Sequence, residues 1–127
     1  MIRQTLAGAA LLLLAACSTS QQQDAHTQFV TIESGATILA TTATAYVSLP
    51  TCPAKPVCAN PPVVQRIAQA NAALRVAIVQ GRAVFANLAS TQSDLQQAVV
   101  IAQAALDSFK QVTSDPAVVA ALQGASK

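Results

Sequence analysis

Apolar residues recur at alternating intervals of three and four positions in the segment between about His26 and Leu49. These positions are Phe29, Ile32, Ala36, Leu39, Ala43 and Tyr46. The spacing predicts an α-helix with one apolar face. Gly35 and the threonines within residues 37–44 lower helix propensity, which leaves a strand as the less favoured alternative. Pro50 is expected to end the segment, because proline lacks an amide donor.

The same spacing predicts two more helices, separated by a polar segment. Asn60 is an N-cap candidate, and the two prolines after it suit a first helical turn. The positions that repeat this spacing are Val64, Ile67, Asn71, Leu74, Ile78, Gly81, Phe85 and Leu88, of which Asn71 is polar. After the polar residues 89–94, in which Thr91 and Asp94 resemble a capping box, a third helix is expected to about Val112. Its apolar positions are Leu95, Val99, Ala102, Leu106 and Phe109.

The heptad phase runs unbroken through residues 89–94, since steps of four and three from Leu88 reach Gln92 and Leu95. A continuous coiled-coil helix over residues 63–113, about 75 Å long at 1.5 Å per residue, is therefore the alternative to a hairpin. We favour the hairpin, because the rod would lack the usual e and g charges and would expose its apolar face. The expected fold is all-α: a small antiparallel hairpin or three-helix bundle.

A short C-terminal helix is expected to close one end of this bundle. It begins at Ser114-Asp115-Pro116, carries Val118, Val119 and Leu122 on its apolar face, and stops at Gly124. The antiparallel hairpin also places two ion pairs near cross-helix positions. These pairs are Arg75 with Asp107 and Arg82 with Asp94.

The first 17 residues follow a different pattern. Arg3 supplies a positive charge, residues 6–14 form an apolar run short for a membrane span, and Leu14-Ala15-Ala16-Cys17 follows. This run resembles the lipobox of bacterial lipoproteins. The resemblance implies that residues 1–16 are a signal peptide removed by signal peptidase II, and that Cys17 carries diacylglycerol and an amide-linked acyl chain such as palmitate. An ordinary secretory signal or an uncleaved anchor helix is the alternative.

Acylation at Cys17 implies anchoring in a lipid bilayer. Lipoproteins retained at the inner membrane typically carry Asp after the lipidated cysteine, so Ser18 resembles the sorting signal for the outer membrane of a Gram-negative host. The protein would then face the periplasm; in another host it would lie on the outer face of the cytoplasmic membrane. Residues 17–25 are polar and aperiodic, and we expect a flexible tether there, before a helical domain over 26–127.

The remaining cysteines, Cys52 and Cys58, lie in the proline-rich loop 50–62. In an exported protein such a pair predicts a local disulfide, worth about 2 kcal/mol on the loop-entropy model. Their spacing is no standard redox motif, and no histidine or acid near them completes a zinc site.

Composition narrows the function. The chain of 127 residues is 53% hydrophobic, 9% charged and 3% aromatic, so it offers neither a basic stripe nor a stacking platform, which argues against nucleic-acid binding. The five acids are scattered, and no catalytic or phosphate-binding motif occurs. We expect no catalytic, cofactor-binding or metal-binding residue, and no role for His26. The expected function is a noncatalytic helical interaction or structural module of the cell envelope, with an envelope protein as partner.

Two alternatives rest on resemblance. The acylated Cys17, the heptad spacing and Lys127 resemble the major murein lipoprotein, whose last lysine is joined to peptidoglycan; the proline-rich loop and the Ser126-Lys127 ending depart from its pattern. Small phage lipoproteins, either outer spanins or superinfection-exclusion proteins, also carry proline-rich parts. The oligomeric state stays open at this point.

Overall fold

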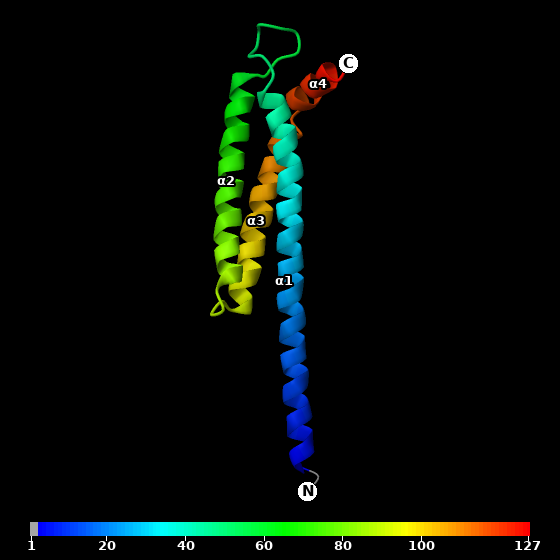
Figure 1. Ribbon diagram of the computed structural model, residues 1–127, viewed down its shortest axis with the longest axis vertical. Coiled ribbons are helices and arrows are strands. Elements are labelled where there is room, and N and C mark those ends of the chain that lie inside the picture. Colours follow the sequence, from blue (N-terminus) through cyan, green and yellow to red (C-terminus); the bar gives the residue numbers. More distant parts are fainter. Residues whose placement is uncertain (1–2) are drawn as a thin grey trace.

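The computed structural model describes the backbone of residues 3–127 and the side chains of residues 20–127. Its helices are α1 (Arg3–Val47), α2 (Pro61–Ala86), α3 (Gln92–Thr113) and α4 (Pro116–Ala125). Helices α1, α2 and α3 run side by side in alternating directions, and α4 lies across the end at which α1 meets the 48–60 loop (Figure 1). The predicted all-α bundle is confirmed, as are the hairpin and the short C-terminal helix.

The continuous helix over 63–113 is wrong, because local polar groups end α2 and start α3. The Ser90 hydroxyl donates to the Val84 carbonyl at 2.7 Å, and the Asn87 side chain accepts from the Ala89 amide at 3.0 Å. The predicted capping box is present: the Thr91 hydroxyl accepts from the Asp94 amide, while the Asp94 carboxylate accepts from the Thr91 amide. These bonds outweigh the unbroken heptad phase.

Threonine does not prevent α1 from forming. The hydroxyls of Thr27, Thr31, Thr37, Thr41 and Thr44 each donate to the carbonyl four residues earlier, at 2.8–3.1 Å. Each side chain thus finds a partner within its own helix, which removes the competition that favours strands or turns. The strand alternative for this segment is wrong.

Helix α1 also begins earlier than expected. In place of the flexible tether expected over residues 17–25, the backbone there belongs to α1. Glutamine is a good helix former, and Ala25 is already buried against the bundle. The helix therefore continues through a polar segment that has no periodicity of its own.

The apolar faces expected from the sequence form the core. Tyr46, Leu74, Phe109 and Val118 are the largest fully buried side chains. Leu88 is the exception: α2 ends at Ala86, and Leu88 is fully exposed in the connection. Gly124 does not stop the last helix, which continues through Ala125.

Both expected ion pairs are wrong. Arg82 pairs with Glu33 of α1, and Arg66 pairs with Asp115 at 2.8 Å. Asp94 instead accepts from Thr91, and Asp107 accepts from Gln103. The predicted pairs considered only the two helices of the hairpin, whereas α1 lies close enough to α2 for its Glu33 to pair with Arg82.

Candidate functional site

The residues expected to matter are Cys17, Cys52 and Cys58. The side chain of Cys17, and those of the expected signal peptide, lie outside the described residues. Cys52 and Cys58 lie at disulfide distance, with their Cα atoms 5.0 Å apart, which is typical of a bonded pair. Within the part of the chain that is described, no helix combines the length and the hydropathy of a membrane span.

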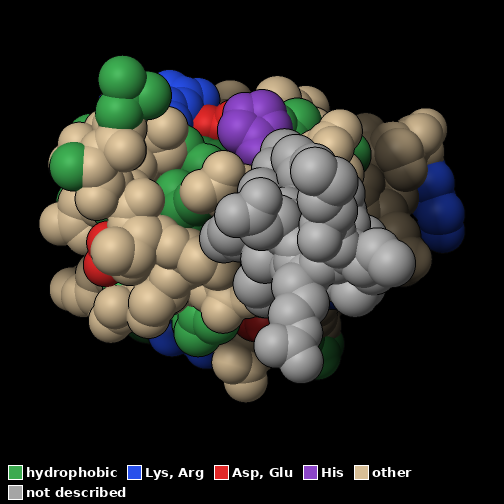
Figure 2. All heavy atoms as spheres, turned by 90° about the horizontal axis from the view of Figure 1, so that it is seen from below, with side chains coloured by type: hydrophobic (Ala, Val, Ile, Leu, Met, Phe, Trp, Pro, Cys, Tyr) green, Lys and Arg blue, Asp and Glu red, His purple; other side chains and the backbone are tan. Residues whose placement is uncertain are grey.

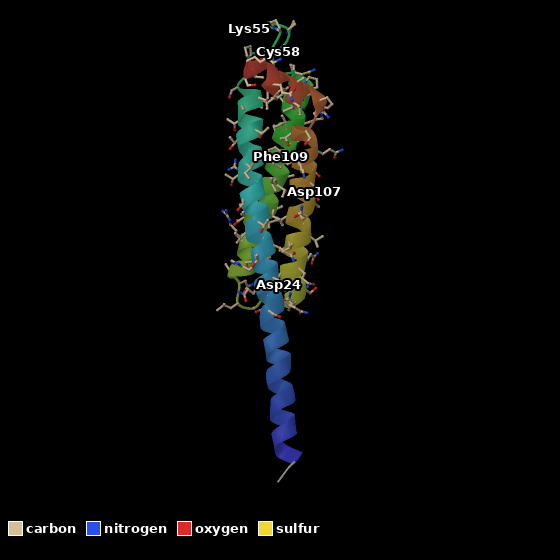
Figure 3. The ribbon with its side chains drawn as sticks, turned by 90° about the vertical axis from the view of Figure 1, so that its right-hand side faces the viewer. Asp24, Lys55, Cys58, Asp107 and Phe109 are labelled. Carbon is tan, nitrogen blue, oxygen red and sulfur yellow. A yellow bond between two sulfur atoms is a disulfide. The ribbon has the colours of Figure 1, made fainter. Side chains whose placement is uncertain are left out.

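The cysteine loop is a small ring at one end of the bundle. The Cys52 amide donates to the Ala59 carbonyl at 3.1 Å, and the Ala59 amide donates to the Pro50 carbonyl at 2.8 Å. Lys55 lies at the tip of the ring, and Asp24 lies far away toward the other end of the bundle (Figure 3). The ring is therefore closed twice at its base, by the cysteines and by backbone hydrogen bonds.

Tyr46 joins this ring to the core. Its ring is fully buried, and its hydroxyl accepts a hydrogen bond from the Asn60 amide at 2.9 Å. Asn60 itself makes no side-chain cap, so the tyrosine satisfies an amide at the start of α2. The apolar spacing predicted only an inward-facing Tyr46, and nothing in the sequence indicated this bond.

Aromatic side chains fill the core at the other end. The rings of Phe29 and Phe85 lie 4.9 Å apart, and the His26 ring meets Phe85 edge-on at 5.8 Å. His26 is exposed but has an aromatic partner, which the sequence interpretation did not foresee. Figure 2 shows this end of the molecule, where charged side chains are few and scattered.

The most distinctive surface is a groove between α2 and α3. Two adjoining hollows of about 470 and 450 Å³ share Ala77, Gln80 and Ile101 in their walls. Its other lining residues are Ala72, Ala73, Val76, Gly81, Ala83, Val84, Asn87, Ala89, Ser90, Asp94, Gln97, Ala98 and Ala105. We call this surface the α2–α3 groove. Val76 and Ile101 leave about half of their surface exposed in it.

Charge is confined to one end of the α2–α3 groove. Asp94 is the only charged residue in its lining, and it is held by Thr91. By contrast, the hollow of about 840 Å³ between α1 and α3 includes Asp107 and several polar side chains. The sequence contained a signal for the groove: Ala72, Val76 and Ala83 lie on a second apolar stripe of the helix that also carries the core face.

The two perturbed carboxyl groups serve helix ends. The pKa of Asp94 is lowered chiefly by the hydrogen bond from the Thr91 backbone, and further by the Thr91 hydroxyl. The pKa of Asp115 is lowered chiefly by the Ala117 amide at 2.9 Å, and further by Arg66. Both carboxylates begin a helix, so their shifts have a structural cause.

Among the described residues, no group of three or more His, Cys, Asp or Glu side chains is placed to hold a metal ion. Comparison of the chain with models of protein families, with curated proteins and with solved structures gives no match. The functional argument therefore rests on the N-terminal sequence around Cys17 and on the α2–α3 groove.

Proposed function

We propose that the protein is a bacterial lipoprotein, acylated at Cys17, whose helical bundle is a noncatalytic interaction module of the cell envelope. The run Leu14-Ala15-Ala16-Cys17 carries this proposal. Its place in the fold supports it, since α1 leaves the bundle at the end opposite the disulfide ring (Figure 1). An anchor there holds the bundle by one end and leaves the sides of α2 and α3 accessible.

The helical backbone of residues 17–25 sets the distance to the bilayer. At 1.5 Å per residue this segment spans about 12 Å, less than half of what an extended tether would reach. From Cys17 to the end of α1 at Val47 the helix covers about 45 Å. The lipidated protein would therefore stand on the membrane as a short rod, with Lys55 and the disulfide ring at its far end.

The α2–α3 groove supports the interaction role. It is an exposed apolar surface on a protein with few charges, and such surfaces in soluble domains usually bind another molecule. For a Gram-negative host we propose the outer membrane, periplasm-facing, on the strength of Ser18.

Metabolic labelling with an alkyne-bearing palmitate tests the anchor. We expect label on the wild-type chain and none on Cys17→Ser, with the wild type in the membrane fraction and the variant released from it. The double variant Cys52→Ser with Cys58→Ser is the matched control, because it keeps Cys17 and should keep the label. Equal labelling of wild type and Cys17→Ser would overturn the proposed anchor.

Separation of inner and outer membranes tests the location. Ser18→Asp should move the labelled protein from the outer to the inner membrane, while Ser20→Asp, a similar change two residues on, should leave it in place. Unchanged fractionation of Ser18→Asp would contradict outer-membrane sorting.

A further inference from the structure

We propose that the connection between α2 and α3, residues 87–91, contacts the lipid surface through Leu88. We call this connection the hairpin tip. It gives the bundle a second point of attachment beside the acyl chains on Cys17. The inference rests on the proposed function, because the anchor decides which end of the bundle faces the bilayer. It goes beyond that function by assigning a lipid-contact site.

Leu88 stands out among the apolar side chains. In the part of the chain whose side chains are described, it is the most exposed large one, at 103%, whereas the others that are exposed keep between 42% and 68%. It lies between Asn87 and Ala89, and residues 87–91 carry no charge. A single exposed leucine is ordinary on a protein surface. Its position and the polar groups around it therefore decide its role.

The hairpin tip lies at the height of the N-terminal part of α1. Gln96 of α3 lines one hollow with Gln21 and Asp24 of α1. Because α1 and α3 run in the same direction, the start of α3, four residues before Gln96, lies level with about residue 20 (Figure 1). Cys17 follows about 5 Å further along α1 at 1.5 Å per residue. The tip and the proposed lipid site thus lie at nearly the same end of the bundle.

The lipid interface reaches this height. The headgroup region of a bilayer is about 5–8 Å thick on each side of the hydrocarbon core. The sulfur of an acylated Cys17 is bonded to glycerol, which lies in this layer. Since α2 and α3 pack beside α1, a hairpin tip about 5 Å from the level of Cys17 lies among the headgroups when the bundle stands upright.

The backbone of the hairpin tip suits a less polar layer. Burying an amide away from water is costly unless the amide is hydrogen-bonded. Four amides of the tip already have acceptors within the protein: Asn87 donates to the Val84 carbonyl, Ala89 to the Asn87 side chain, Ser90 to the Asn87 carbonyl and Thr91 to the Asp94 carboxylate. Contact with lipid leaves these bonds intact, so the gain from covering the leucine is not cancelled.

Leu88 acts together with the acyl chains and not in their place. One leucine is too small to hold a protein on a membrane, since even a single myristoyl chain binds only reversibly. Once Cys17 is in the bilayer, the tip is held close to the lipid and the second contact forms at a high effective concentration. Two attachment points resist tilting of the bundle, which keeps the disulfide ring away from the membrane.

Tryptophan fluorescence in vesicles tests the contact. The chain contains no tryptophan, so each variant reports one site. The acylated Leu88→Trp chain, in vesicles of phosphatidylethanolamine and phosphatidylglycerol, should lose at least half of its emission when the acyl chains are brominated near their glycerol end. Val79→Trp, at a largely exposed site on α2 farther from the tip, should lose none. Equal emission of Leu88→Trp with and without bromine, or equal quenching of the two variants, would overturn the proposal.

A thiol experiment repeats the test without an aromatic probe. In Leu88→Cys the new thiol is the only free one, because Cys17 is acylated and the other two cysteines are paired. In the same vesicles a charged maleimide should modify Leu88→Cys at least fivefold more slowly than Val79→Cys, each relative to the same chain unfolded in urea. Adding Asn87→Asp should abolish the difference, since it keeps the oxygen that accepts from the Ala89 amide but adds a charge that lipid excludes. Equal rates without Asn87→Asp, or a slow rate that persists with it, would contradict the contact.

Mass spectrometry of the same preparations separates this inference from the proposed anchor. A chain that is acylated at Cys17, but whose Leu88→Trp variant is not quenched, would overturn the lipid contact and leave the anchor standing. A chain without an acyl group, whose Leu88→Trp variant is nevertheless quenched in vesicles, would contradict the anchor and leave the contact standing.

Discussion

The two ends of the bundle are held together in different ways. At the end with the cysteine loop, the disulfide ring, the bond from the Asn60 amide to Tyr46 and the ion pair of Arg66 with Asp115 join segments distant in the sequence. At the other end, a short polar connection closes the hairpin, and Phe29 packs on Phe85 directly over Gly81. The loop end adds a disulfide to its packed core, whereas the hairpin end has no covalent crosslink and combines close packing with polar bonds.

This difference has a physical origin in the residues available. The chain has few aromatic side chains, so a core built largely of alanine buries little area per residue. The loop end has Tyr46, Phe109 and Val118 fully buried, yet it must also fix a proline-rich loop, which the disulfide and Tyr46 accomplish. The hairpin end has no such loop; its short connection is held by the bonds of Asn87 and Ser90, and Gly81 makes room for the Phe29 ring.

The largest effect is expected from the core of the loop end. Phe109→Ala should lower the free energy of unfolding by about 3–5 kcal/mol, because the ring is fully buried and its removal leaves a cavity. Val100→Ala on the same helix, at a largely exposed side chain, should cost less than about 0.5 kcal/mol. Urea denaturation followed by circular dichroism measures both; similar losses for the two variants would contradict the burial of Phe109.

Removing the disulfide should have the next largest effect. Cys52→Ser with Cys58→Ser should lower the free energy of unfolding by about 2 kcal/mol, because the unfolded chain without the disulfide has more conformational entropy. Amide hydrogen exchange should become faster in the ring and in α4, because Val57 of the ring lies close to Gly124 of α4. Exchange near Phe85 should stay unchanged. The wild type under reducing conditions is the control. Equal loss of protection at both ends would show that the ends are not independent.

Gly81→Ala tests the packed end. The added Cβ would lie 2.3 Å from the Phe29 ring, so the ring must move. Overpacking outweighs the gain in helix propensity, and we expect a net loss of about 1–2 kcal/mol. Gly35→Ala is the matched control, since its Cβ would lie 3.4 Å from Leu106, and it should stabilise the protein by about 0.5–1 kcal/mol. A stabilising Gly81→Ala would contradict the close approach of Phe29.

The smallest effect is a pH dependence at the start of α3. Because the pKa of Asp94 is lowered in the folded protein by the Thr91 backbone, its carboxylate stabilises the fold above the ordinary carboxyl pKa of about 4. This contribution is lost as the pH falls through the lowered pKa. Amide exchange in the first turn of α3 should therefore rise in acid. Asp94→Asn should remove this dependence, whereas Asp107→Asn, on the same helix, should retain it.

Most of the secondary structure could be predicted from the sequence. The apolar spacing predicted the buried faces of α1, α2 and α3. The Thr91–Asp94 capping box predicted the start of α3, and the two cysteines of one short loop predicted that they pair with each other. These features depend on residues close together in the sequence. The prediction that Leu88 lies on the core face was wrong, because the hydrogen bonds of Asn87 and Ser90 end α2 before this residue.

What the sequence determined by itself is the set of helices, their inward faces and a lipobox-like N-terminus. The tertiary structure alone decided that residues 20–25 continue α1, that Arg82 pairs with Glu33, and that Tyr46 fixes the start of α2. It also decided which second apolar stripe stays uncovered, and so created the α2–α3 groove. The physical reason is that periodicity and capping act within one helix, whereas ion pairs and exposed faces depend on which helix lies beside which.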